Sequence, residues 1–284
     1  MLLPSMIFLI IFSFIPMFGI IMAIQNYMPA KGILGSKFVG LENFKFMFQM
    51  PDSKQIFMNT IIIAFWKIVV GTIVTIVFAL LLNEIRLKWA KKSIQTIVYL
   101  PNFLSWVILS TVVVNVFAYD GPINDFLEML GLERILFMAS NDWFRPMLIV
   151  TDVWKGFGYG AIIYLAALSG IDPGLYEAAA IDGANRFKRV LHITLPGILP
   201  TIMLVTIMNL PNILNAGFDQ IFNLYNPLVM ETSDIIDTYV YRVGLVQRQY
   251  SLGTAVGLMR SIVGIILILS ANKLAQKVTD YRIF

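Results

Sequence analysis

The stretch PGLYEAAAIDGANRFKRVLHITLP, residues 173–196, is a mostly polar segment in a chain whose other long segments are largely apolar. Its three consecutive alanines, beginning at Ala178, favour a helix, and Arg186, Lys188 and Arg189 make its second half basic. The segment ends at a leucine and a proline that open the next apolar run. Because a charged helical segment between two apolar runs has to face water, we expect it to be a docking surface for a separate protein.

Composition indicates a chain built for a lipid bilayer. Of its 284 residues, 58% are hydrophobic and 13% are charged, and the mean hydropathy is +0.78, values well away from those of soluble proteins. The absence of cysteine excludes disulfides, thiol catalysis and thiolate-bound metals. The net charge is +4, and the basic residues are scattered over short loops. This distribution argues against nucleic acid as a partner. We therefore expect an integral membrane protein surrounded by lipid.

Six apolar stretches are long enough to cross a bilayer, which takes about 20 helical residues. No polar segment between them could form a second domain, so we predict one all-α membrane domain over residues 1–284. The first stretch is too long for a signal-peptide core and has no cleavage site, which indicates a retained helix. Because it lacks a basic flank, we expect a natural segment before Met1. The predicted spans are residues 3–24, 56–82, 95–118, 146–168, 198–217 and 252–272.

The loops fall into two sets of opposite charge. The loop after the second span, the segment 170–196 and the C-terminal tail carry an excess of basic residues, whereas the opposite loops carry an excess of acidic residues. Short basic loops remain in the cytoplasm. We therefore expect segment 170–196 and both termini to be cytoplasmic, in a multi-pass protein of a bacterial cell membrane.

Seven residues of the opening segment follow a specific spacing: E-A-A, three residues, G, nine residues, I, one residue, L-P. This spacing resembles the cytoplasmic EAA loop of binding-protein-dependent ABC importer permeases. An alanine-rich helix followed by a glycine presents small side chains that a partner can approach closely. The alternative is an amphipathic interfacial helix without a partner. The matching residues, which we predict to couple to an ATPase, are Glu177, Ala178, Ala179, Gly183, Ile193, Leu195 and Pro196.

The resemblance covers essentially the whole chain and implies a type I ABC importer permease with six transmembrane helices. It implies a coupling helix, Pro173 to Gly183, against an ATPase subunit, and an arm that leads from Ala184 to a hinge at Leu195 and Pro196. The implied partners are a second, homologous permease, two ATPase subunits and an extracytoplasmic sugar-binding protein. The chain itself would hold no cofactor, since the ATPase subunits would bind ATP and Mg²⁺.

Two further stretches bear on the substrate. Gly217 to Pro227 and Asp234 to Gly244 look like carbohydrate permeases that handle oligosaccharides and polysaccharide fragments. The chain is similar to the first permease subunit of the maltose-type class but lacks its large periplasmic insert. The resemblance therefore implies an oligosaccharide or a polysaccharide fragment and leaves the particular sugar open.

The predicted fifth span contains several amides around a proline. Pro211 should kink the helix and free backbone carbonyls, and Asn212, Asn215 and Asp219 share one face at helical spacing. A broken helix with amide side chains near the middle of the bilayer suits a sugar, whereas the alternative is interhelical hydrogen bonding. The predicted substrate path comprises Asn209, Asn212, Asn215, Asp219, Tyr225 and Asn226.

Charged residues within predicted spans are energetically expensive and indicate either a pathway or internal pairing. Asp152 and Lys155, three residues apart, could neutralise each other or contact substrate. Lys67 and Arg260 could pair across helices, with Asp152 or Asp219, or bind ligand. We include Lys155 and Arg260 in the predicted path, because together with Lys67 they would suit an acidic sugar.

Two other classes of function remain as alternatives. A secondary transporter would need no EAA loop and should show repeat-related halves, which the sequence lacks. An intramembrane lipid-linked sugar transferase would need clustered acids and bases at one membrane face. The chain has one histidine, His192, and no Gly-Lys-Ser/Thr phosphate loop, so we expect no metal site and no ATPase activity of its own.

Overall fold

The computed structural model describes residues 3–209 and 213–279, with side chains up to residue 270. The described chain is helical, apart from a two-residue antiparallel pairing of β1 (Gln25–Asn26) with β2 (Lys37–Phe38). The all-α prediction is therefore confirmed for this part of the molecule.

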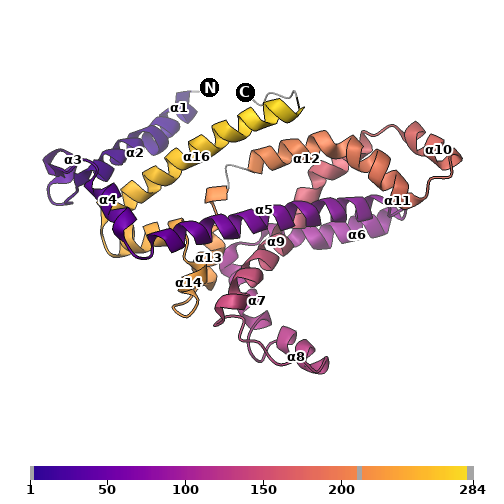
Figure 1. The fold of residues 1–284 in the computed structure, drawn as a ribbon, viewed down its shortest axis with the longest axis horizontal. Helices are drawn as coiled ribbons and strands as arrows, with labels where there is room; N and C mark the ends of the chain where they lie inside the picture. The colour runs from indigo at the N-terminus through magenta and orange to yellow at the C-terminus, as the bar shows by residue number, and fades with distance from the viewer. Residues whose placement is uncertain (1–2, 210–212, 280–284) are drawn as a thin grey trace.

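Two long helices form the centre of the molecule, α5 (Ser53–Asn83) and α9 (Asn141–Ser169), which lie side by side (Figure 1). α6 (Lys88–Tyr99) packs against α9 at Gly158, where a Cβ atom would lie 2.4 Å from Cγ1 of Val98. Glycine is therefore required at that crossing. α12 (Leu195–Asn209) closes the other side, with Ile198 buried among residues of α5 and α9.

The first helical run and the last long helix form a second unit. Residues Leu3–Ile24 comprise α1 (Leu3–Leu9), a π segment (Ile10–Phe14), α2 (Ile15–Met17) and a 3₁₀ segment (Phe18–Ile24). α16 (Tyr250–Thr279) packs against the last of these and against the π segment Val240–Val246. A Cβ atom at Gly253 would lie 2.8 Å from the Cα atom of Gly244, so the two backbones touch. Most of the run Leu3–Ile24 is exposed, which suits a lipid-facing helix.

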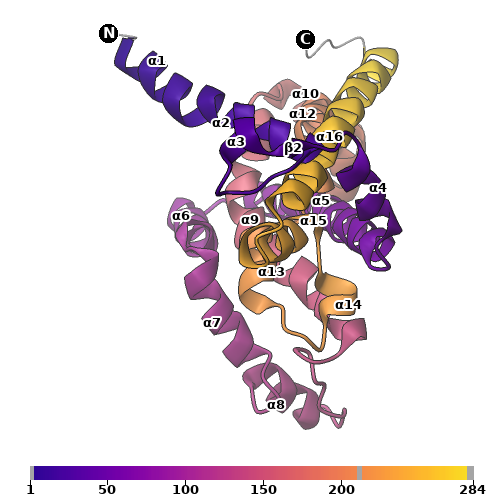
Figure 2. The same cartoon turned by 90° about the vertical axis from the view of Figure 1, so that its left-hand side faces the viewer.

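Short elements cap the two ends of the long axis. α10 (Pro173–Ile181) and α11 (Arg186–Arg189) lie at one end, and α3 (Gly32–Gly35) and α4 (Glu42–Gln49) lie at the other (Figure 1). α7 (Trp106–Val116) leads away from the body to α8 (Pro122–Met129), as Figure 2 shows. α14 (Met230–Ser233) and α15 (Ile236–Tyr239) connect α13 (Phe218–Leu224) to α16.

Within the described residues, four helices are long and apolar enough to cross a membrane: Leu3–Ile24, Ser53–Asn83, Arg186–Asn209 and Tyr250–Ser270. A bent pair, Lys88–Phe103 with Trp106–Val116, would make a fifth if it is counted as one span. The predicted fourth span lies within α9, which has 29 residues but carries charges that lower its hydropathy.

The predicted third span, residues 95–118, is not one straight helix. Its two halves meet at 106°. Pro101 lies in a 3₁₀ turn, Leu100–Phe103, and Leu104 is extended. Proline cannot donate the helical backbone hydrogen bond, and Ser105 then starts a new helix by accepting a hydrogen bond from the Ile108 amide at 3.4 Å.

The predicted fifth span, residues 198–217, also needs correction. Within the described residues its helix begins earlier, at Arg186, and runs to Asn209. Residues 215–217 are not helical, and Gly217 has a φ of +92°, a left-handed conformation that favours glycine, just before α13 begins. Pro211 lies outside the described residues.

Candidate functional site

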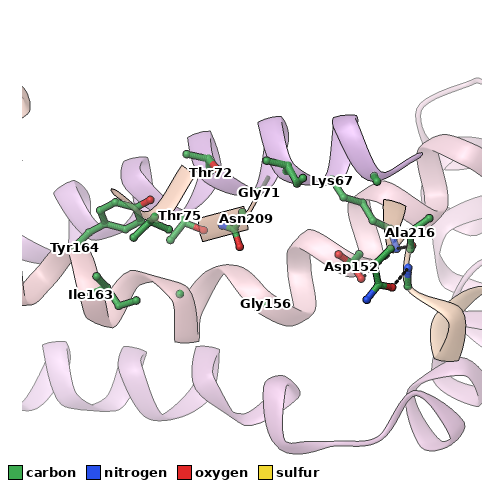
Figure 3. A pocket seen from close by; sticks show the side chains of 16 residues that line it. Lys67, Gly71, Thr72, Thr75, Asp152, Gly156, Ile163, Tyr164, Asn209 and Ala216 are labelled. Atoms are coloured by element: carbon green, nitrogen blue, oxygen red, sulfur yellow. Dashed lines mark hydrogen bonds and ion pairs between the residues drawn. The ribbon is translucent and has the colours of Figure 1, made fainter. Parts of the chain in front are cut away.

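A groove of about 450 Å³ runs between α5, α9 and α12 (Figure 3). It is open beside Gly156, where a Cβ atom would meet no atom within 4 Å. Its volume is in the range of small-molecule sites. The groove is lined by Ala64, Lys67, Ile68, Gly71, Thr72, Thr75, Asp152, Gly156, Gly160, Ile163, Tyr164, Val205, Asn209, Asn215, Ala216 and Gly217.

Lys67 forms a buried cationic centre at one end of this groove. Its side chain is 8% exposed, and its Nζ atom lies 3.3 Å from Oδ1 of Asp152. The same nitrogen donates hydrogen bonds to the carbonyl of Ala216, at 2.7 Å, and to Oε1 of Gln220. A buried charge is tolerated only when it is paired and hydrogen-bonded, and Lys67 meets both conditions. Figure 3 shows Lys67, Asp152 and Ala216 together at this end.

Gln220 holds the segment after α12 against the two long helices. It is fully buried, and its Nε2 atom donates to the carbonyl of Leu148 and to Oγ1 of Thr151, both at 2.8 Å. Its amide oxygen therefore faces Lys67. A Cβ atom at Gly217 would lie 3.0 Å from the Lys67 nitrogen, so this glycine lets the lysine approach the backbone.

The opposite end of the groove carries hydroxyl groups. Tyr164 is 2% exposed, and its hydroxyl is buried without a hydrogen-bond partner among the described residues. Thr72 and Thr75 of α5 lie near it, and Asn209 lies between the two ends (Figure 3). A buried unpartnered hydroxyl is unfavourable, so this end is suited to a ligand that supplies hydrogen bonds.

Only part of the predicted substrate path lines the groove. Asn209 and Asn215 do so, whereas Asn212 lies outside the described residues. The prediction that Asn212, Asn215 and Asp219 share a helical stripe is wrong for Asn215, which lies in a non-helical segment. Asp219 is exposed in the first turn of α13 and does not line the groove.

Tyr225 and Asn226 lie beyond α13, away from the groove lining. The Nδ2 atom of Asn226 donates to the carbonyl of Met138 at 2.8 Å, and its Oδ1 atom accepts from the Leu228 amide at 3.0 Å. Tyr225 packs against Phe222 with ring centroids 6.1 Å apart. Their observed contacts shape the connection between α13 and α14.

One of the predicted pairings of the intramembrane charges is present, whereas Lys155 and Arg260 have other partners. Asp152 pairs with Lys67, as one of the cross-helix alternatives predicted, and not with Lys155. The Nζ atom of Lys155 instead donates to the carbonyl of Asn102 at 3.0 Å and lies over the Trp106 ring, 5.8 Å from its centroid. Lys155 therefore steadies the bend between α6 and α7 and does not line the groove.

Arg260 also lies off the groove. It pairs with Asp237 of α15, rather than with Asp152 or Asp219. Burial raises the pKa of the Asp237 carboxyl, and the positive charge of Arg260 opposes that shift. Of the three cations that suggested an acidic sugar, Lys67 alone lines the groove, and its charge is balanced by Asp152.

Sequence reasoning missed Gln220 and Tyr164. The signal for Gln220 was a polar residue three positions after Gly217 and directly before the apolar pair Ile221 and Phe222. Tyr164 gave no comparable signal, because a tyrosine in an apolar run is equally suited to a membrane interface.

The EAA segment folds as two helices joined by a tight turn. Asp172 begins α10 by accepting a hydrogen bond from the Gly174 amide at 2.9 Å. The helix ends in a Schellman motif, in which the Ala184 amide donates to the Ala179 carbonyl at 2.9 Å and the Gly183 amide donates to the Ala180 carbonyl at 3.2 Å. Gly183 has a φ of +76°, so the glycine of the motif has a conformational reason.

The predicted contact residues of this segment are accessible. Glu177, Ala178 and Gly183 are exposed, and Ala179 is half-buried. The apolar side chains of Leu175 and Ile181 are 52% and 88% exposed, which suits a surface covered by another protein.

The arm after the turn leads without interruption into the fifth span. Asn185 caps α11 by accepting from the Lys188 amide at 2.8 Å, and a π segment, Val190–Thr194, joins α11 to α12. Ile193 lies in that π segment, and Leu195 and Pro196 begin α12. The widened turn before Leu195 and Pro196 accommodates the proline, which has no backbone N–H, without breaking the helix. The hinge at these two residues stays a prediction.

Comparison with known proteins identifies the family of the chain. Residues 71–280 match the family described as "Binding-protein-dependent transport system inner membrane component". Protein LplB of Bacillus subtilis is 41% identical over 100% of this chain and 90% of its own length. The polygalacturonan/rhamnogalacturonan transport system permease protein YteP of the same organism is 41% identical over 100% of this chain and 89% of its own.

Solved structures agree with these sequence matches. A bacterial ABC transporter involved in the import of the acidic polysaccharide alginate contains a chain that is 38% identical, with a TM-score of 0.89 over 98% of this chain and 94% of that one. The bacterial alginate ABC transporter in complex with an alginate pentasaccharide-bound periplasmic protein gives 37% identity and a TM-score of 0.90, over 100% and 95%. The fold is that of a type I ABC importer permease, and the chain belongs to the family of binding-protein-dependent transport system inner membrane components.

Proposed function

We propose that this chain is one permease subunit of an ATP-driven importer that carries an oligosaccharide or polysaccharide fragment across a bacterial cell membrane. The observation that carries the proposal is the groove of about 450 Å³ between α5, α9 and α12, with polar groups at both ends. The substrates in the names of YteP and the alginate transporter support a sugar polymer as the cargo.

The groove offers the kinds of groups that recognise sugar hydroxyls. Asn209 and Asn215 supply both donors and acceptors, Asp152 supplies an acceptor, and Tyr164 supplies an unpartnered hydroxyl. Because Lys67 and Asp152 balance each other, we expect binding through hydroxyls, without selection for a charged sugar.

The EAA segment, residues 170–196, which we call the coupling loop, is joined to the groove by one helical run. Residues Arg186–Asn209 begin next to Gly183 and end at a residue that lines the groove. A displacement of α10 by an ATPase subunit would therefore be carried along this helix to Asn209. We propose that this is how nucleotide-driven closure changes access to the groove.

The remaining parts of the importer are assigned to partners. Two ATPase subunits would bind ATP and Mg²⁺, and this chain would act as a permease without enzymatic activity. A second, similar permease would close the open side of the groove, and an extracytoplasmic binding protein would deliver the sugar. In this arrangement the chain crosses the bilayer six times, with α9 as a full crossing, and both termini and α10 face the cytoplasm.

The test is uptake of oligosaccharides by proteoliposomes that contain this chain with its partner subunits. We expect uptake that requires ATP and the binding protein, and an Asn209→Ala variant with a KM about two- to tenfold higher, the effect of one or two lost hydrogen bonds. Asn223→Ala is the matched control, because Asn223 bonds within α13 and does not line the groove.

Uptake that needs no ATP would identify a secondary transporter and overturn the proposal. If instead ATP-dependent uptake occurs but Asn209→Ala and Asn223→Ala behave alike, the importer would stand and the position of the sugar would be wrong.

A further inference from the structure

A second cavity of about 100 Å³ lies between the connection from α5 to α6 and the arm of the coupling loop. Three of its residues are arginines, and one is acidic. We call it the arginine pocket, and it is lined by Glu84, Arg86, Tyr176, Arg186, Arg189, Val190 and Thr194. It is separate from the groove, with which it shares no lining residue.

In the part of the chain that the structure describes, the arginine side chains of this pocket have no ion-pair partner. Among the described residues, none of the guanidinium groups of Arg86, Arg186 and Arg189 forms an ion pair within 4.0 Å or a side-chain hydrogen bond. The Nε atom of Arg189 is buried and has no hydrogen-bond partner among the described residues. A buried donor of this kind is unfavourable unless a ligand completes it.

The chemistry of the pocket suits an oxyanion. Planar guanidinium groups bind phosphate oxygens through paired hydrogen bonds. The Tyr176 and Thr194 hydroxyls are hydrogen-bonded to each other at 3.0 Å. Each hydroxyl has one hydrogen, so the pair can donate one hydrogen bond to a ligand. The cavity has room for several water-sized groups, which fits a phosphate and is too small for a sugar chain.

The surroundings of the pocket indicate where that phosphate comes from. The pocket lies where α5 ends at Asn83 and the span Arg186–Asn209 begins, so it is at a membrane boundary. The apolar side chains next to it in sequence, Leu87, Trp89 and Phe187, are 61%, 71% and 74% exposed. Basic pockets flanked by exposed aromatic and aliphatic groups at the end of a span are suited to lipid headgroups.

We propose that the arginine pocket binds the phosphate group of an anionic phospholipid. Tyr176 belongs to α10 and Arg86 to the connection between α5 and α6, so a bound phosphate would join the coupling loop to the body of the permease. Anionic lipid at this boundary would then steady the coupling loop against α5.

The first experiment is native mass spectrometry of the full chain in detergent, with added phosphatidylglycerol or phosphatidylcholine. We expect tighter retention of phosphatidylglycerol, because the choline group of the other lipid neutralises its phosphate. The double variant Arg86→Gln with Arg189→Gln should weaken phosphatidylglycerol binding by about tenfold or more. Lys91→Gln with Lys92→Gln is the control, since it removes the same charge from α6 outside the pocket.

Three outcomes would overturn the proposal. Equal affinity for the two lipids would exclude a headgroup-specific site, and equal losses in the two double variants would indicate diffuse attraction by surface charge. If millimolar inorganic phosphate displaces all bound phosphatidylglycerol, and phosphate alone raises the unfolding temperature as much as the lipid does, the site serves a free anion.

A second measurement guards against misfolding and against another occupant. Arg86→Gln alone changes an exposed side chain, and its unfolding temperature without lipid should equal that of the wild type while the increase caused by phosphatidylglycerol is lost. If the pocket variant instead loses co-purification of the ATPase subunit in lipid-free detergent, the arginines bind that protein and the lipid assignment is wrong.

Discussion

The coupling loop and the Lys67 end of the groove are held together in opposite ways. α10 buries none of its residues, and its shape comes from backbone bonds and caps within its own short stretch. Lys67, in contrast, is buried and binds Ala216 and Gln220, which are 149 and 153 residues away in sequence. Substitutions in the loop should therefore change function and leave stability intact, whereas substitutions at Lys67 should change stability first.

The largest expected effect is that of Lys67→Met. Removal of the cation leaves Asp152, the Ala216 carbonyl and Gln220 without their partner, and breaking a buried ion pair from one side destabilises by about 3 kcal/mol or more. The measurement is thermal unfolding of the purified chain in detergent. Lys155→Met is the control, because this half-buried lysine has one backbone hydrogen bond and is expected to have the smaller effect. Equal destabilisation of the two variants would remove the distinction between the Lys67 centre and an ordinary intramembrane cation.

In contrast to the Lys67 end, the hydroxyl end of the groove should keep its stability when its tyrosine is substituted. Tyr164→Phe removes a hydroxyl that has no partner among the described residues, so the unfolding temperature should stay the same or rise. The KM for sugar uptake should rise by about two- to tenfold, as one ligand hydrogen bond is lost. A destabilised Tyr164→Phe variant with unchanged KM would show that the hydroxyl is satisfied within the protein.

The smallest expected effect is on selection between neutral and uronic oligosaccharides. Arg260 pairs with Asp237 and does not line the groove. In Arg260→Gln, the ratio of the uptake rates of the two sugars should therefore stay within about twofold of the wild-type ratio, because the charge of Arg260 is balanced by Asp237 and its side chain does not line the groove. A selective loss of uronic sugar uptake would instead place Arg260 on the substrate path.

The parts of the molecule that the sequence predicts well are those set by local rules. Gly183 and the alanines before it already indicate a short helix with a left-handed end, and the structure has that turn. The hydropathy of residues 3–24 and 56–82 likewise predicts membrane-spanning helices, because their length and apolar composition alone are enough for that prediction. Pro101 could also have predicted the bend in the third span, because proline interrupts helical hydrogen bonding. The apolar run around it favoured one continuous span instead.

The groove depends on contacts that no local spacing reveals. Asp152 is one of four intramembrane charges, and a sequence offers several pairings for it, of which Lys67 is the observed one. Gln220 binds Leu148 and Thr151, more than 60 residues earlier, and its role follows only from the way α13 turns back against α9. The stripe expected for Asn215 and Asp219 is not formed, because residues 215–217 are not helical and Gly217 has a left-handed conformation just before α13.

The central claim is that movement of the exposed coupling loop changes access to the groove. It is tested most directly by Gly183→Asp compared with Gly131→Asp. Both glycines have positive φ, +76° and +74°, and an added Cβ atom would meet nothing within 4 Å at either, so the two substitutions impose similar strain. With the complete transporter, we expect Gly183→Asp to abolish ATP-dependent uptake and to reduce co-purification of the ATPase subunit, while Gly131→Asp retains the ATPase. Normal uptake and ATPase retention in Gly183→Asp would contradict the account, and equal unfolding temperatures of Gly183→Asp and Gly131→Asp would show that the two variants are comparably folded.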